Sequence, residues 1–186
     1  MEPSSQWTRH SFKQIKVQVE KATEQGKCVV IKDEAGNVPA FFQYTGTLVE
    51  VYKLKMQMLI AGKSKEDVLE ELRVNLIGAM RFGKSLCLHM GKVTWDFKSE
   101  MNDATKFPSD KVFDLPQWKD NSAEHWRPLI HNESEDTDYT GLNKGTFDCQ
   151  PDFNIVIVTD CESEAEVAEL MAGIPHAEKF VKFVVA

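Results

Sequence analysis

The fold is decided by residues 64–90, which read SKEDVLEELRVNLIGAMRFGKSLCLHM. Between Val68 and Met80, apolar side chains recur at the i, i+3, i+4 spacing of a helix with one buried face. Ser64 can accept from the open N–H groups of the first turn, and Gly83 can end the helix without steric strain. The stretch predicts a helix, a tight corner and a buried strand, at residues 64–82, 83–85 and 86–90.

The same stretch contains the letters of a phosphate-binding loop, because residues 78–85 fit G-x-x-x-x-G-K-[ST]. In a working loop a strand enters and a helix leaves, so that backbone N–H groups and the positive end of the helix face the phosphates. Here the helix comes first, which would offer a phosphate the negative end of its dipole. We therefore expect no working phosphate loop. In the alternative, a nucleotide-binding ATPase-like enzyme would bind ATP with Mg²⁺ through Gly78, Gly83, Lys84 and Ser85.

A second near match, residues 61–64, is predicted to have the better context, with a strand before it and a helix after it. Its first glycine position is occupied by Gln57, however. We interpret this stretch as a turn that ends in a helix cap. In the ATPase-like alternative, Gly62–Ser64 would replace the first loop, and Asp33 or Asp160 would serve either loop.

Length, charge and composition limit the classes of protein to which the chain can belong. The chain has 186 residues, a net charge of -7 and an isoelectric point near 5.3, which argues for one domain and against a nucleic-acid or anionic-membrane partner. No apolar run approaches the ~20 residues of a membrane span, and the N-terminus lacks the apolar core of a signal peptide. The four cysteines contain no C-x-x-C pair. We expect a cytoplasmic protein without disulfides.

Strand and helix patterns alternate along the chain, which predicts a mostly parallel sheet covered by helices on both faces. The predicted strands are residues 27–32, 48–54, 86–90, 153–159 and 180–185, and the other predicted helices are residues 11–24, 38–44 and 162–171. Ligands of such sheets bind at the carboxyl ends of the strands. That rule points to Asp33, to residues 54–55 and to Gly91.

The domain organisation follows from where this alternation holds. Residues 1–10 are predicted to be a disordered tail, and residues 11–186 a single α/β domain. Within it, residues 91–150 form a long irregular segment rich in aromatic and acidic side chains. We expect its aromatic side chains to pack partly on the domain and its acidic run, residues 131–138, to be a solvated loop. A third alternative is a peptide- or protein-binding surface in this aromatic segment, around Trp118 and Trp126.

Several stretches carry a resemblance to a known family. Residues 29–37, VVIKDEAGN, followed by Phe41 and Phe42, look like a strand ending in Ile-Asp-Pro-Gln before a helix with an aromatic residue. Residues 48–54 and 68–88 look like the family's next strand and its helix ending in Phe-Gly. Asp148 and residues 153–160, then 182–185, look like its later phrases. In order and spacing, residues 27–186 resemble the ATP-binding dynein motor region, the fifth AAA+ unit of the dynein heavy-chain ring.

The resemblance implies a three-layer AAA+-like fold of the P-loop NTPase type, and a cilium or flagellum as a possible location. The family's Pro-Gln is Glu34-Ala35 here, and the second Thr of its sensor-like phrase is Asp160. By the resemblance the phosphate loop would lie before Lys27, yet no glycine precedes Gly26. The resemblance therefore implies a module without a functional phosphate loop.

Catalytic and metal sites find little support in the residue pattern. Asp33 and Asp160, with Thr159, could hold Mg²⁺ at strand ends, but without a phosphate cradle they are better explained as turn residues and helix caps. A zinc site and two nucleophile pairs lack the required spacing: Cys149, Cys161, His125 and His131 for zinc, and Cys87 with His89 or Cys161 with His176 for the nucleophiles. We predict no catalytic residue and no metal ligand.

The sequence thus predicts a non-catalytic AAA+-like scaffold or protein-interaction module without a cofactor. Its partner is expected to be a protein. The chain ends directly after an apolar run, so we expect it to be part of a larger dynein-like or cilia-associated polypeptide.

Overall fold

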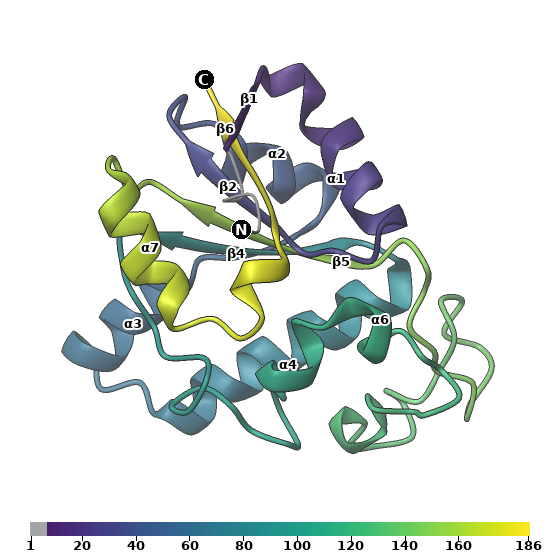
Figure 1. Ribbon diagram of the computed structural model, residues 1–186. Coiled ribbons are helices and arrows are strands. Elements are labelled where there is room, and N and C mark those ends of the chain that lie inside the picture. The colour runs from purple at the N-terminus through teal and green to yellow at the C-terminus, as the bar shows by residue number, and fades with distance from the viewer. Residues whose placement is uncertain (1–6) are drawn as a thin grey trace.

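The computed structural model describes residues 7–186, which build one sheet of six parallel strands in the order β1-β6-β2-β5-β4-β3 (Figure 1). The strands are β1 (Thr8–His10), β2 (Val29–Asp33), β3 (Thr47–Val49), β4 (Ser85–Gly91), β5 (Asn154–Thr159) and β6 (Val181–Val185). The central strands β2, β4 and β5 are almost fully buried. This burial explains their continuous apolar runs.

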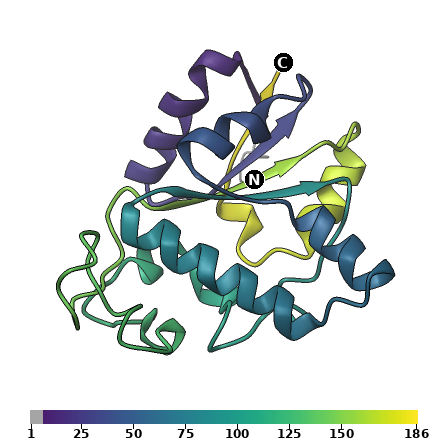
Figure 2. The same cartoon turned by 180° about the vertical axis from the view of Figure 1, so that it is seen from behind.

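Helices cover both faces of the sheet, as Figures 1 and 2 show. One face carries α1 (Ile15–Glu24), which follows the 3-10 turn η1 (Phe12–Gln14), and α2 (Val38–Thr45). The other carries α3 (Val51–Ile60), α4 (Lys65–Phe82), α5 (Ser109–Val112), α6 (Leu115–Trp118) and α7 (Glu164–Ala172), with 3-10 turns η2 (Arg127–Leu129) and η3 (Ala177–Lys179). The predicted α/β fold with helices on both faces is confirmed.

The helix, corner and strand predicted from residues 64–90 are confirmed as α4 and β4. Ser64 Oγ accepts the N–H of Asp67 at 3.0 Å, and Asp67 Oδ2 lies 2.7 Å from the same hydroxyl. Gly83 ends the helix at φ 61°, in the left-handed region. The buried face of α4 packs beneath the sheet in the larger of the two apolar cores.

The predicted strand at residues 48–54 is wrong in its second half. β3 ends at Val49, and α3 begins at Val51. Val51 and Leu54 are the buried residues of this helix, at the i, i+3 spacing of a helical face. Residues 54–55 therefore lie inside a helix and not at the carboxyl end of a strand.

The predicted tail at residues 1–10 is too long. Thr8–His10 forms β1, which pairs in parallel with β6, so that Thr8 lies opposite Phe183. Residues 1–6 of that tail lie outside the described part of the chain. A three-residue polar strand at a sheet edge leaves almost no periodic signal in the sequence.

The irregular segment is a packed part of the domain. Most of its aromatic side chains are buried, among them Trp118 and Trp126, while Tyr139 is 64% exposed, so the two tryptophan rings themselves are not open to a bound peptide or protein. The acidic run is not wholly solvated either. Arg73 of α4, only 3% exposed, donates to both carboxylate oxygens of Glu135 at 2.8 and 2.9 Å.

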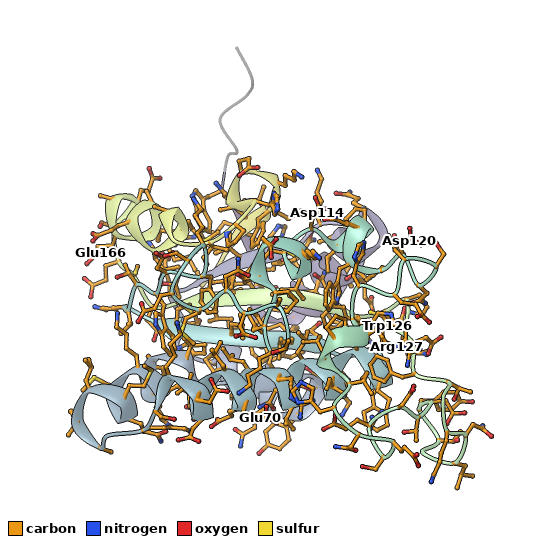
Figure 3. The ribbon with its side chains drawn as sticks, turned by 90° about the horizontal axis from the view of Figure 1, so that it is seen from below. Glu70, Asp114, Asp120, Trp126, Arg127 and Glu166 are labelled. Atoms are coloured by element: carbon orange, nitrogen blue, oxygen red, sulfur yellow. The ribbon has the colours of Figure 1, made fainter. Side chains whose placement is uncertain are left out.

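Figure 3 shows how this segment is distributed below the sheet. Trp126 and Arg127 lie at one end of the molecule, and Glu166 of α7 lies at the other. The Arg127 guanidinium stacks over the Trp126 ring, with 4.7 Å from Cζ to the centroid. Within residues 7–186, no helix has the length and apolar character needed to cross a bilayer.

Candidate functional site

The carboxyl edge of the sheet is where β2, β4 and β5 end next to one another, and it contains the strand-end residues singled out by the sequence. Asp33 is the last residue of β2, Gly91 the last of β4, and Asp160 follows β5. The register places these ends together, because β5 pairs with both β2 and β4. In a parallel sheet this edge is the usual place for a ligand.

At the end of β2, the chain passes through residues 34–37 into α2, the order that a phosphate loop requires. The Asp33 carboxylate accepts hydrogen bonds from backbone N–H groups at the start of that helix. Its Oδ1 accepts the N–H of Gly36 at 2.8 Å, and its Oδ2 accepts the N–H of Val38 at 2.9 Å. Pro39 has no N–H. Of the first three helical positions, at most one donor is therefore left for a ligand.

Two effects act on the Asp33 carboxyl in opposite directions. Burial raises its pKa above the ordinary value, and the nearby Asp160 carboxylate adds to the rise. The hydrogen bonds from Val38 and Gly36 lower the pKa by less than burial raises it. This negative, well-buried group stands where a bound phosphate would meet the positive end of α2.

The N-terminus of α7, the helix that follows β5 at this edge, is also capped by side chains of the chain. Ser163 Oγ accepts the N–H of Glu166, and Glu166 Oε2 accepts the N–H of Ser163 at 2.9 Å and of Glu162 at 3.1 Å. This is a complete capping box. Both helix N-termini that follow the central strands are thus satisfied by side chains of the chain itself.

Thr159 joins the ends of β4 and β5. Its buried hydroxyl donates to the carbonyl of Gly91 at 2.9 Å and accepts the N–H of Cys161 at 3.2 Å. The backbone N–H of Asp160 also donates to the Gly91 carbonyl, at 2.9 Å. Thr159 therefore has a structural role, which agrees with the sequence interpretation of strand-end turn residues.

His89 and Asp160 form a pair that residue spacing did not reveal, since they are distant in the chain. His89 Nε2 lies 3.0 Å from Asp160 Oδ2, and the Tyr52 ring lies edge-on to the imidazole at a centroid distance of 5.0 Å. His89 Nδ1 is buried and has no hydrogen-bond partner within residues 7–186. The strand order could have revealed this pair. β4 and β5 are neighbours, and His89 lies opposite Val158, two residues before Asp160.

The charged groups around this edge are also paired. Glu34 binds Arg9 and, at 3.2 Å, Lys32. Glu162 binds Lys92 at 2.5 Å, and the Lys32 ammonium donates to the Glu162 carbonyl at 2.6 Å. The carboxyl edge consequently has its cations engaged by its own acids.

The residues with phosphate-loop letters lie at the opposite, amino edge. Gly78 is inside α4, and Ser85 begins β4. The N–H of Gly83 donates to Met80 at 3.3 Å and that of Lys84 to Ala79 at 2.9 Å, so both end the helix. The entry from a helix and exit into a strand agree with the predicted direction. Gly83, Lys84 and Ser85 line one cavity, while Gly78 does not.

The predicted context of residues 61–64 is wrong. They follow α3, a helix, and lead into α4. Lys63 binds Glu71 at 2.5 Å and Gln57 at 3.3 Å. The stretch is a helix-to-helix turn with Ser64 as the cap, which agrees with the interpretation given from the sequence.

The zinc and nucleophile candidates are not assembled into sites. Within residues 7–186, no three His, Cys, Asp or Glu side chains come together as a metal site. Burial raises the pKa of the Cys87 thiol well above its ordinary value, which disfavours a reactive thiolate. His176 Nε2 lies 2.9 Å from the carbonyl of Asp110.

The resemblance implied a phosphate loop before Lys27, but the described residues there offer little space. Between β1 and η1 only Ser11 intervenes, whereas four residues separate the central strand β2 from α2. The strand-to-helix loop of interest is therefore the one after β2. Comparisons of the chain with protein-family models, with curated proteins and with solved structures find no match.

Proposed function

We propose that the chain is a non-catalytic AAA+-like scaffold or protein-interaction module, part of a larger dynein-like or cilia-associated protein. Counted from β2 as the first strand, β6-β2-β5-β4-β3 follow the order 5-1-4-3-2. The first of these strands lies inside the sheet with later strands on both sides of it, as in an open doubly wound α/β sheet, and this arrangement supports the P-loop-like part of the proposal. The all-parallel pairing adds to this support.

One observation carries the non-catalytic part of the proposal. In the strand–loop–helix unit at the centre of the sheet, the Asp33 carboxylate accepts the N–H groups of Gly36 and Val38. A nucleotide phosphate would have to displace this carboxylate and then sit beside its negative charge. The loop, DEAGN, also has no lysine to reach a phosphate.

The alternative function is an ATPase-like enzyme that uses Gly78, Gly83, Lys84 and Ser85, with ATP and Mg²⁺ as cofactors. The cavity beside Lys84 favours it. Against it, the N–H groups of Gly83 and Lys84 already donate within the helix end and are not free for a phosphate. The C-terminal end of α4 also carries the unfavourable partial charge.

Titration calorimetry of the 186-residue chain with Mg-ATP tests the choice between the two functions. We expect no saturable binding at millimolar nucleotide and no release of phosphate. Lys84→Ala and Lys63→Ala serve as matched variants. Binding by the wild-type chain that Lys84→Ala abolishes would establish the alternative, and loss with Lys63→Ala would favour the second near match.

A further inference from the structure

A cavity opens at the amino edge, between α1 and α2 and over the starts of β4 and β5. Its volume is about 760 Å³, within the range of small-molecule sites. On α1 it is lined by one helical face that includes Val19 and Glu24, and on α2 by Phe41 and Phe42. The corner at residues 83–85 and the loop at residues 151–152 complete it.

The floor of this cavity contains apolar side chains that pack on one another. Val19 is 7% exposed and Phe42 is 2% exposed. Phe41 lies edge-on to Phe42 with ring centroids 5.0 Å apart, and edge-on to Phe12 at 5.8 Å. Such a floor would bury an apolar side chain of a ligand.

The rim carries charges that the chain leaves unpaired. Within residues 7–186, Lys84, Glu24 and Asp152 take part in no ion pair. The remaining two charged rim residues, Lys16 and Glu20, are 3.8 Å apart and offset each other. The rim thus offers one ammonium and two carboxylates without an ion-pair partner, and the Lys119 ammonium, which donates to the Pro151 carbonyl at 2.7 Å, lies near Asp152.

This charge pattern discriminates between ligand classes. A nucleotide triphosphate would meet the Glu24 and Asp152 carboxylates beside Lys84, and their repulsion would offset the attraction of that lysine. A simple fatty acid would use Lys84 and leave the acids without a partner. A zwitterion with an apolar body matches all three groups, with its carboxylate at Lys84 and its ammonium at Glu24 and Asp152.

We propose that this cavity is a binding site for short apolar peptides whose amino and carboxyl termini are both free. The site goes beyond the proposed scaffold function and does not depend on it. It also gives a role to Lys84, which the sequence marked by its place in the phosphate-loop letters.

The test uses the dipeptide Leu-Phe with ¹⁵N-labelled chain and follows the amide signals of residues 83–85 by NMR. We expect saturable shifts at these residues. N-acetylation or C-amidation of the dipeptide should each weaken binding about tenfold, the effect of losing one charge-assisted contact. Lys84→Met should remove the preference for the free carboxylate, and the double variant Glu24→Gln with Asp152→Asn the preference for the free amine.

Lys111→Met, which removes an exposed lysine on α5, is the matched control and should change neither preference. The affected lining residues are exposed, so these variants should fold. Absence of saturable shifts in the wild-type chain would overturn the peptide site and leave the scaffold proposal standing. Lys84-dependent binding of Mg-ATP in place of the dipeptide would overturn both, and binding with unchanged preferences in all variants would refute the assigned contacts.

Discussion

At the carboxyl edge of the sheet, polar side chains form hydrogen bonds and ion pairs with one another. At the amino edge, several charged side chains around an open cavity have no ion-pair partner within residues 7–186. Asp33 and Glu166 cap the helices that follow the central strands. Lys84 and Asp152 face a cavity without an ion-pair partner from residues 7–186. In a parallel sheet the carboxyl edge is the usual ligand site. Here the helices that follow β2 and β5 at that edge are capped by side chains, and the cavity beside Lys84 lies at the opposite end of the strands.

The physical reason lies in the helix ends. Helices that leave the carboxyl edge begin with unsatisfied N–H groups, which side-chain oxygens can fill as well as a ligand can. At the amino edge α4 arrives with its C-terminal end, which Gly83 closes through backbone contacts alone. Side chains near that corner are therefore not needed to cap the helix and remain available to a ligand.

The largest expected effect concerns the structure that supports the amino edge from below. Trp118 is fully buried, and its indole N–H points at Met80 Sδ at 3.0 Å. Trp118→Ala should lower the free energy of unfolding by about 3–5 kcal/mol, because it leaves a large cavity. Chemical denaturation measures it, with Trp126→Ala as a second buried site. A loss below about 1 kcal/mol would mean that this segment is not packed as described.

A smaller effect is expected from removing the Thr159 hydroxyl, which joins β4 and β5 at the carboxyl edge. Thr159→Val keeps the shape of the side chain but leaves the Gly91 carbonyl and the Cys161 N–H with one partner fewer. We expect a loss of about 2 kcal/mol in the free energy of unfolding. The matched change at the amino edge, Ser85→Ala, should stay within about 0.5 kcal/mol. Equal effects would remove the difference between the edges.

Removing the cap of α2 should cost somewhat less. Asp33→Ala frees the N–H groups of Gly36 and Val38 and should lower the free energy of unfolding by about 1 kcal/mol. Asp152→Ala at the amino edge is the control and should have almost no effect. If Asp33→Ala also created phosphate binding, the carboxylate would be shown to occupy an otherwise competent site.

The pH dependence of stability should distinguish Asp33 from Glu135. Because burial raises the pKa of Asp33, its contribution is fully present below the ordinary pKa and is lost as the pH rises through the raised value. The Arg73 guanidinium lowers the pKa of Glu135 to about 2, so its contribution is present above the ordinary pKa and lost as the pH falls toward that value.

The destabilisation caused by Asp33→Asn should therefore shrink with rising pH, and that of Glu135→Gln with falling pH. Urea denaturation at several pH values between about 3 and 7 measures both trends. The same trend for both variants would contradict the burial assigned to Asp33.

The smallest effect is expected from inorganic phosphate. With the N-termini of α2 and α7, the helices that follow the central strands, already capped, millimolar phosphate should not raise the melting temperature above that in chloride at equal ionic strength. A rise that grows with phosphate concentration would show that an anion can replace the caps, and the contrast between the edges would weaken.

Much of this architecture could be predicted from the sequence because its signals are local. The apolar stripe of α4, the cap at Ser64 and the buried runs of β2, β4 and β5 each lie within a few residues. α3 was missed because Met56, Leu59 and Ile60 are exposed, at 46%, 71% and 76%, so its apolar residues do not mark one buried face. Propensity alone then favoured a strand for the Val-rich stretch before it.

For the candidate site, the sequence predicted which residues lie at strand ends but not which contacts they make. Asp33, Gly91 and Asp160 were expected at strand ends, and Asp33 was interpreted as a turn or cap residue. The pairing of His89 with Asp160 and the burial of Glu135 against Arg73 depend on which distant elements become neighbours. The amino-edge cavity likewise arises from four separate parts of the chain. Single-sequence periodicity contains no information on such neighbours.

The pairing of β1 with β6 has a kinetic consequence. Thr8 meets Phe183, so this contact closes a loop of nearly the whole chain. Such a closure is entropically slow, and β1 is short and lies at the rim of the sheet. We expect β1 to join the sheet last during folding and to be the first strand to fray, so that its amides exchange with solvent well before those of β2.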